Sequence, residues 1–241
     1  MSTSIRDVGR HVEDLAPRSL TAIDYGSFMH GEPDAACTGV AVTWTPSLAV
    51  LRRAAEQGMN LVVSHEFPYF PHAPSNWWRN QAEMLAKPVN LARLRILEAH
   101  RMCLYRVHAP IDFAPGWGIV DAFGEALGFG PAKARDCAVV MYELARPEKL
   151  DDLAQRVKKT MGLPAVRVAG EPSRPISRIA TAVGGLGQSY GIAEAAAGLG
   201  AHCILFGEAV DYAFRYAIDA GLAVIETAHH ASESYGLRNL A

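Results

Sequence analysis

One pattern occurs four times in this chain of 241 residues and limits the folds that it can adopt. A helix-like segment leads into a short apolar run of strand length, and His, Glu or Asp follows that run. The apolar runs cover residues 61–63, 102–107, 202–206 and 222–225. Helices that alternate with buried strands predict an α/β fold.

The polar residues after these runs are of the types that bind metal ions. They are His65 and Glu66, His108 and Asp112, Glu208 and Asp211, and His229 and Glu233. Ligands of open α/β sheets collect beyond the carboxyl ends of the strands, where these side chains are expected to lie. Neutral imidazole and carboxylate together form the ligand set of Zn, Mn and Fe sites. The donors exceed what one tetrahedral ion needs, so the sequence predicts two divalent ions.

A histidine at the end of a strand is more often a hydrogen-bonded structural residue than a ligand. Three pairs of histidine and carboxylate in equivalent positions reverse that expectation. His202 is the first residue of its run, ahead of the apolar residues, and is expected to be structural. Ser64 and Ser189 do not stand in the GxSxG pattern of a nucleophile, so a serine hydrolase is not expected.

The segment FPYFPHAPSNWWRN, residues 67–80, follows Glu66 directly and has neither helical nor strand periodicity. Loops of this length in compact domains are usually functional. One interpretation is a lid or substrate wall, in which His72, Trp77 and Trp78 contact the substrate. The other is a surface loop anchored by the two tryptophans. His230 is a further candidate substrate contact, because in an extended chain it would point away from its neighbour.

The sequence also supports an interpretation for each of three other segments. The sequence VGGLGQS, residues 183–189, lies between a predicted strand and a predicted helix. It lacks the Walker lysine and the GxGxxG spacing, so it either lets the backbone approach a neighbouring site or binds an anion. Residues 24–34 are rich in Gly, Asp and Pro and predict a loop, and residues 147–161 predict an amphipathic helix.

Composition excludes several classes of protein. A net charge of −2 argues against nucleic acid as a partner, which would require a basic surface. The four cysteines have no CxxC spacing and are expected to be free thiols in a reducing compartment. No apolar run has the ~18 residues of a membrane span, and the first residues lack the features of a signal peptide. We therefore expect a cytoplasmic protein without a membrane partner.

Five segments together resemble a known family. They are SHEFPYF (64–70), YRVHAPID (105–112), VGGLGQS (183–189), FGE (206–208) and AHHASESYGLRNL (228–240). In this order they are similar to the marks of the NIF-three-like dinuclear metal centre proteins, some of which are called type 2 homologues of GTP cyclohydrolase I. The resemblance covers nearly the whole chain, and the last segment is its most specific part.

The resemblance implies a single NIF-three-like unit over residues 1–241, made of two similar interlocked α/β halves without a separable linker. Each half would be a mixed sheet flanked by helices, with a metal pair between the halves and a homohexamer built from dimers. It also implies that His65, Asp112, His229 and Glu233 are metal ligands and that His108 lines the site. At residue 66 the family usually has a second histidine followed by proline, whereas this chain has Glu66.

The expected function is a metal-dependent hydrolase that acts through a metal-bound hydroxide. The resemblance to the family alone implies the target, a C–N bond of a small cyclic or amide substrate. His65 and Glu233 would hold one ion, Asp112 and His229 would hold the other or bridge the two, and Glu66 would complete the ligand set. His108 would move the proton, because an imidazole titrates near neutral pH. The alternative is a non-enzymatic hexameric scaffold that stores, delivers or senses metal. An open coordination position would favour the enzyme, and a site closed by protein ligands would favour the scaffold.

Overall fold

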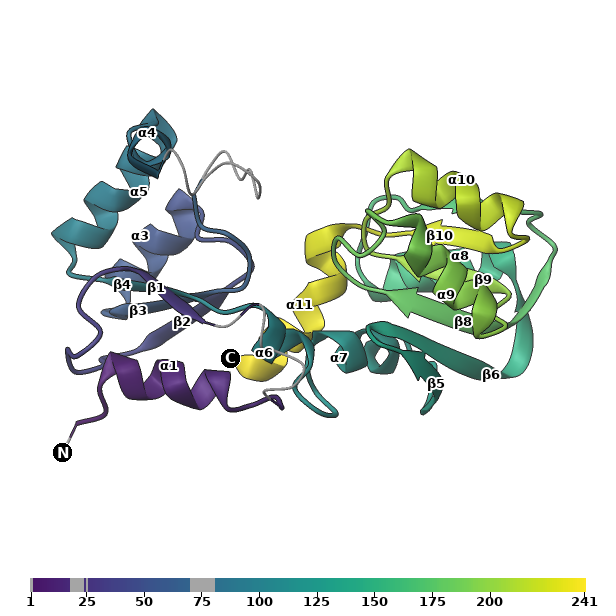
Figure 1. Cartoon of the computed structure of the whole chain (residues 1–241), viewed down its shortest axis with the longest axis horizontal. Coiled ribbons are helices and arrows are strands. Elements are labelled where there is room, and N and C mark those ends of the chain that lie inside the picture. The colour runs from purple at the N-terminus through teal and green to yellow at the C-terminus, as the bar shows by residue number, and fades with distance from the viewer. Residues whose placement is uncertain (1, 18–23, 25, 70–80) are drawn as a thin grey trace. The chain divides into compact units, whose positions relative to one another are not determined.

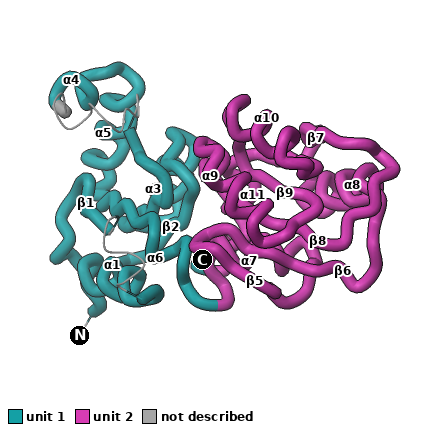
Figure 2. The backbone as a smooth tube through the Cα atoms, turned by 45° about the vertical axis from the view of Figure 1, so that its right-hand side comes forward, with its two compact units in different colours: residues 1–115, 240–241 teal, residues 116–239 magenta. Residues whose placement is uncertain are grey.

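The computed structural model of this chain divides into two compact units (Figures 1 and 2). Unit 1 comprises Met1–Pro115 and Leu240–Ala241, and unit 2 comprises Gly116–Asn239. The structure describes residues 2–17, 24, 26–69 and 81–241. Each unit is built on its own sheet.

Unit 1 contains a four-stranded mixed sheet in the order β1-β4-β3-β2. Its strands are β1 Ser27–His30, β2 Val40–Thr43, β3 Leu61–Ser64 and β4 Cys103–Arg106. Its helices are α1 Ile5–Glu13, α3 Leu48–Glu56, α4 Gln81–Leu85, α5 Pro88–Ala99 and α6 Ala109–Asp112. Strands β2, β3 and β4 are parallel, and β1 is antiparallel to β4. The carboxyl ends of the three parallel strands therefore lie at one edge of the sheet.

Helices cover both faces of this sheet (Figure 1). Leu51 of α3 and Leu97 of α5 pack with Val62 of β3 in one apolar cluster. On the other face Gly9 of α1 lies against the ring of Tyr105. A strand that is covered on both faces is buried along its whole length, which explains why β3 is apolar from Leu61 to Val63 and why the hydroxyl of Ser64 needs a hydrogen-bond partner.

Unit 2 contains a six-stranded mixed sheet in the order β5-β6-β8-β9-β10-β7. Its strands are β5 Ala132–Asp136, β6 Val139–Lys149, β7 Arg167–Ala169, β8 Pro175–Ala182, β9 Cys203–Phe206 and β10 Ala223–Glu226. Its helices are α7 Ile119–Ala126, α8 Leu150–Thr160, α9 Tyr190–Gly198, α10 Asp211–Asp219 and α11 His229–Leu240. The central strands β8, β9 and β10 are parallel to one another. These two mixed sheets with their helices confirm the predicted fold class.

Small residues bring helices α9 and α10 close to the sheet of unit 2. Ala193 and Ala196 of α9 and Ala217 of α10 are fully buried against Ile204 and Phe206 of β9. Since a methyl group fills little space, the helix axes can lie near the strands. The segments that join these helices to β8 and β9 are thereby fixed beside the carboxyl ends of the strands.

Two segments differ from the sequence prediction. The predicted loop over residues 24–34 contains β1, because its backbone pairs with β4, and Phe28 lies opposite Tyr105. The helix predicted over residues 147–161 begins only at Leu150, because β6 continues to Lys149 through pairing with Pro175 of β8. In both places strand pairing with a distant segment decides the local conformation.

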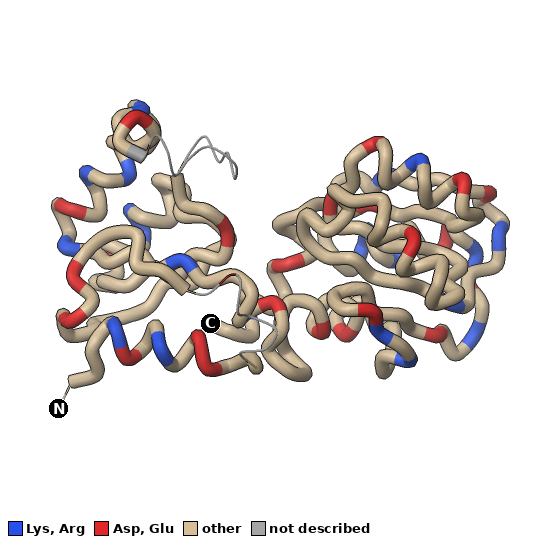
Figure 3. Tube along the Cα trace, in the orientation of Figure 1, with Lys and Arg blue, Asp and Glu red and all other residues tan. Residues whose placement is uncertain are grey.

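In both units Lys and Arg are interspersed with Asp and Glu along the trace (Figure 3). The two signs nearly balance, which agrees with the net charge of −2. Across the described ranges, none of the helices has the length and apolar character required to cross a membrane.

Gly236 tests the packing of α11 within unit 2. A Cβ atom at Gly236 would lie 2.5 Å from the backbone Cα of Ile119, at the start of α7. Gly236→Ala should therefore lower the free energy of unfolding by about 1–3 kcal/mol, the usual cost of overpacking. The measurement is urea denaturation followed by circular dichroism.

Gly198→Ala is the matched control, because a Cβ atom there meets open space. Alanine has the higher helix propensity, so this variant should gain up to about 1 kcal/mol. Equal stability of the two variants would show that α7 can shift to accommodate a methyl group, and that Gly236 is not required for the packing of α11 against α7.

Candidate metal centre

Backbone hydrogen bonds that continue past the strands fix the first candidate ligands in unit 1. The N–H of His65 donates to the carbonyl of Thr43 at 3.1 Å, and the N–H of Glu66 donates to the carbonyl of Trp44 at 2.8 Å. The hydroxyl of Ser64 donates to the carbonyl of Glu66 at 2.7 Å. His65 is fully buried as a result, and Glu66 is partly buried.

His108 and Asp112 are positioned by β4 and α6. His108 stands at the N-cap of α6, and Asp112 is the last residue of this four-residue helix. The N–H of Asp112 donates to the carbonyl of His108 at 3.2 Å, which places both side chains on one side of the turn. Asp112 is buried, whereas about a quarter of the His108 side chain is exposed.

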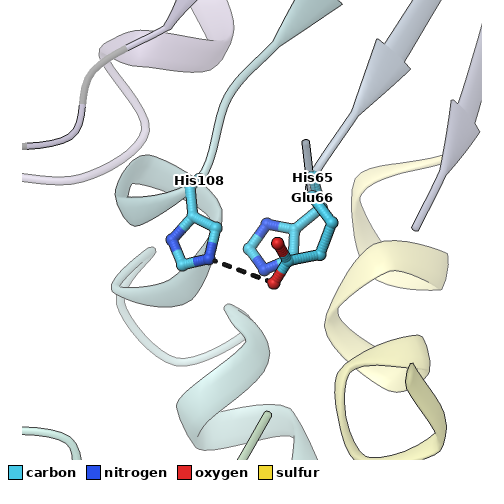
Figure 4. Close-up of side chains that lie close together, drawn as sticks. All are labelled: His65, Glu66 and His108. Atoms are coloured by element: carbon cyan, nitrogen blue, oxygen red, sulfur yellow. Dashed lines mark ion pairs between the residues drawn. The ribbon is translucent and has the colours of Figure 1, made fainter. Parts of the chain in front are cut away.

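These four residues form one cluster in unit 1. Figure 4 shows three of them, His65, Glu66 and His108. The rings of His65 and His108 are stacked, with centroids 4.2 Å apart and an angle of 11° between the planes. The Nε2 atom of His65 lies 3.6 Å from Oδ1 of Asp112, and Nδ1 of His108 lies 2.9 Å from Oδ2 of Asp112. The Nε2 atom of His108 is 3.5 Å from Oε1 of Glu66. His65, Glu66 and His108 each offer one ligand atom within 4.8 Å of the others, so this group could hold a metal ion.

The carboxylates around His108 change its protonation. Burial of the ring disfavours its charged form, but the hydrogen bonds with Asp112 and Glu66 outweigh this effect and raise the pKa of His108 to about 10. The pKa of His108 therefore lies above the neutral range expected from the sequence, because the neighbouring carboxylates favour the charged ring.

Asp24 is part of this cluster, although the sequence analysis did not identify it. Its carboxylate accepts hydrogen bonds from Nη1 of Arg106 at 2.6 Å and from Nη2 at 3.2 Å. Its Oδ2 atom also lies 3.4 Å from Nδ1 of His108. Asp24 lies 82 residues before Arg106 in a segment predicted to be a loop, and no spacing or motif in the sequence indicates this contact.

A second cluster lies in unit 2 at the start of α11. His229 is the first residue of this helix, and Glu233 follows one turn later on the same face. The Nε2 atom of His229 is 3.2 Å from Oε1 of Glu233. On the other side of the ring, Nδ1 of His229 is 2.9 Å from Oε2 of Glu208. The Glu233 side chain is only 4% exposed, whereas that of Glu208 is 47% exposed.

The helical conformation of residues 229–230 corrects the argument about His230. An extended chain would have pointed the two neighbouring side chains in opposite directions, but on a helix they diverge by about 100°. His230 is exposed, and its carbonyl accepts a hydrogen bond from the Ser234 hydroxyl within α11. Its role as a substrate contact stays a prediction.

The glycine-rich segment 183–189 lies directly against this second cluster. A Cβ atom at Gly184 would lie 2.0 Å from Oε1 of Glu233, and one at Gly185 would lie 3.2 Å from Cε1 of His229. The N–H of Gly184 donates to the Ser232 hydroxyl at 2.9 Å, and this hydroxyl donates to the carbonyl of His229 at 2.7 Å. Of the two interpretations of this segment, the structure supports close backbone approach.

The remaining sequence candidates lie elsewhere. Asp211 has a side chain that is 98% exposed, and its ion pair is with Arg167. The ring of His202 contacts the Ser177 hydroxyl at 3.2 Å, which agrees with a structural role. The proposed substrate contacts His72, Trp77 and Trp78 fall outside the described residues.

The donor atoms of each cluster fit a shared divalent ion. Two ligands that are each about 2.1 Å from one ion in a tetrahedral site are about 3.4 Å apart. The separations of 3.6 Å between His65 and Asp112 and of 3.2 Å between His229 and Glu233 are close to this value. Imidazole nitrogen with carboxylate oxygen is a donor set for Zn, Mn or Fe. In unit 1, His65, Glu66 and His108 bring three possible ligand atoms together, and in unit 2 His229 and Glu233 supply a pair of donor atoms.

Comparison with known proteins identifies the family. The chain is 28% identical to the GTP cyclohydrolase 1 type 2 homolog of Pseudomonas aeruginosa, with 100% of this chain and 90% of that protein covered. It is 26% identical to the protein of the same name from Allochromatium vinosum, with 99% and 90% covered. The solved structure of a Bacillus cereus protein related to NIF3 has the same fold, with a TM-score of 0.81 at 13% identity and 100% and 92% covered. The sequence model of the family described as Duf34/NIF3 (NGG1p interacting factor 3) matches residues 3–241, and this chain therefore belongs to that family.

Proposed function

We propose that this chain is a metal-dependent hydrolase that holds two divalent ions and cleaves a C–N bond of a small cyclic or amide substrate. The observation that carries the proposal is the pairing, in each unit, of an imidazole with a carboxylate at the separation of two ligands of one ion. These separations are 3.6 Å from His65 to Asp112 and 3.2 Å from His229 to Glu233. Bound divalent ions would supply Lewis acidity and lower the pKa of water.

The residues of this chain hold and orient the ions. His65 and Asp112 are buried, so their ligand atoms have little freedom to move. Asp112 has one oxygen near His65 and the other near His108, and it links the metal ligand to the neighbouring ring. Glu66 is placed beside the same rings and is assigned as a further ligand.

His108 is assigned to proton transfer during cleavage of the C–N bond. Its ring is stacked on His65, hydrogen-bonded by Asp112 and partly exposed to solvent, so it can exchange a proton with a substrate from the solvent side. A departing nitrogen needs a proton, and proton transfer by a positioned side chain typically contributes about 10²–10⁴ in rate.

The name of the relatives supports a C–N bond as the target. Relatives from several bacteria are called GTP cyclohydrolase 1 type 2 homolog, and a cyclohydrolase opens a ring by hydrolysis. That name belongs to those proteins. For this chain we propose only the class of bond and leave the substrate open to experiment.

A non-enzymatic role in metal storage, delivery or regulation, as a homohexamer, is the second candidate. The complete burial of His65 and the 4% exposure of the Glu233 side chain favour it, because sites closed by protein are typical of structural metals. The partial exposure of His108 and His229 favours the enzyme. Metal binding without turnover of any cyclic or amide substrate would favour the non-enzymatic role over the hydrolase.

His229→Ala tests the metal site and the enzymatic role together. The wild type should bind up to two equivalents of Zn, Mn or Fe(II) per chain, measured by elemental analysis after reloading and dialysis. The variant should lose at least one equivalent together with hydrolysis of a panel of cyclic and amide substrates. Its far-UV circular dichroism should be unchanged, because the side chain is partly exposed at the end of a helix.

His202→Ala is the matched control, because it removes an imidazole at the start of β9 that contacts Ser177 and Arg178. It should retain the metal content of the wild type. A wild type that binds no metal after reloading would contradict the proposal. An unfolded His229→Ala variant would make His229 a structural residue.

Gly184→Ala should disturb the metal site from the backbone side. Gly184 has φ +57°, which favours glycine, and an added Cβ atom would lie 2.0 Å from Oε1 of Glu233. The carboxylate must move, so metal affinity should fall at least about tenfold in a chelator competition. Gly191→Ala, whose Cβ atom would lie at an ordinary 3.5 Å from the Ser189 hydroxyl, should bind metal as the wild type does. Equal affinities for the two variants would exclude Gly184 as a support of the site.

Glu66→His should change the choice of ion. Carboxylate oxygen is a harder ligand than imidazole nitrogen, and oxygen-rich sites favour Mn and Fe(II) relative to Zn. The variant should therefore bind a larger fraction of Zn than the wild type does when equimolar Mn, Fe(II) and Zn compete. The informative quantity is the ratio between the two proteins, because Zn binds more tightly than Mn to most sites. An unchanged ratio would mean that Glu66 does not touch the metal.

A further inference from the structure

The ring of His229 is held between two carboxylates within unit 2. Its Nε2 atom lies 3.2 Å from Glu233, and its Nδ1 atom lies 2.9 Å from Oε2 of Glu208. A neutral imidazole has one donor nitrogen and one acceptor nitrogen, and only the acceptor can bind a metal ion. One of the two carboxylates can therefore share an ion with His229 while the other accepts the ring N–H.

We propose that Glu208 is a positioning residue for metal binding, which accepts the Nδ1 hydrogen of His229 and so makes Nε2 the nitrogen that binds the ion beside Glu233. This inference rests on the proposed metal site. A ligand histidine generally donates its second N–H to a carboxylate or carbonyl, which fixes the tautomer and the orientation of the ring.

The two carboxylates differ in burial, and this difference separates their roles. The Glu233 side chain is only 4% exposed and packs against Gly184. The Glu208 side chain is 47% exposed, on the other side of the ring. A buried carboxylate needs a cation or several donors to offset its desolvation, whereas a half-exposed one does not. Glu233 therefore suits the ion, and Glu208 suits the ring N–H.

The backbone around Glu208 is fixed on two sides. The N–H of Glu208 donates to the carbonyl of Gly184 at 2.9 Å, and the N–H of Val210 donates to the carbonyl of Gly187 at 3.0 Å. On the other side, the N–H of Ala209 donates to Oε1 of Glu226, at the end of β10, at 2.8 Å. These hydrogen bonds restrict the backbone of Glu208. Its carboxylate can therefore hold the ring of His229 in one orientation.

The expected effect is moderate. Removal of a carboxylate that orients a ligand typically costs about 10–100-fold in metal affinity. The value for Glu208 should lie at the lower end of this range, near tenfold, because water screens a half-exposed interaction. Removal of a direct ligand would instead abolish a binding equivalent.

The experiment measures Zn affinity and stoichiometry by competition with a chromophoric chelator in the wild type and three variants. Glu208→Ala should weaken Zn binding about tenfold and keep the wild-type number of equivalents. Glu208→Gln should fall between Glu208→Ala and the wild type, because the amide oxygen still accepts the ring N–H. Asp211→Ala removes the same charge three residues away, where Asp211 contacts Arg167 and not His229, and should match the wild type. All four metal-free proteins should have the same unfolding midpoint.

Each contrary result has a distinct meaning. Equal Zn affinity of Glu208→Ala and Asp211→Ala would overturn the positioning role and leave the proposed metal site intact. Loss of a full equivalent in Glu208→Ala, as expected for His229→Ala, would overturn positioning in favour of direct ligation. A lower unfolding midpoint for Glu208→Ala without metal would overturn it in favour of a structural role. A wild type that binds no Zn would overturn the proposed function, and this inference with it.

Discussion

The candidate site depends on backbone hydrogen bonds that continue the parallel ladders past the ends of the strands. In unit 1 the N–H of His65 donates to Thr43, and that of Val107 donates to Ser64. In unit 2 the N–H of Gly207 donates to Ala182 in the same way. Each bond fixes the first residue beyond a strand as firmly as the strand itself. Polar side chains that would otherwise stand on free loops are thereby held in defined positions.

These positions concentrate charge, which explains the composition of the first cluster. Asp24, Glu66 and Asp112 all lie near His108, and Arg106 is paired with Asp24. Buried carboxylates are costly unless a cation or hydrogen-bond donors face them. The neighbouring carboxylates raise the pKa of His108, and the charged form of the ring offsets their charge. A bound divalent cation would meet the same demand.

In unit 2, close packing of helices and backbone positions the candidate ligands. The buried alanines of α9 and α10 let these helices approach the sheet, and segment 183–189 then passes directly beside α11. At Gly184 the backbone is so near Glu233 that a side chain would occupy the position of the carboxylate. The glycine-rich segment thus makes room for the ligand pair, and Ser232 ties it to the first turn of α11.

The sequence by itself determined the α/β class, most of the helices and strands, and the residue types beyond each parallel strand, because these features follow from local periodicity and chain order. The structure brings His65 and Asp112 together in unit 1, and His229 and Glu233 together in unit 2. Only the tertiary structure decided which distant groups complete each cluster. Asp24 meets Arg106 across 82 residues, and Glu208 meets His229 across 21. The strand β1 formed in a predicted loop for the same reason, since pairing with β4 outweighed its local sequence. Contacts between remote segments depend on which strands pair and how the helices pack on the sheets. Local residue patterns contain no information about that arrangement.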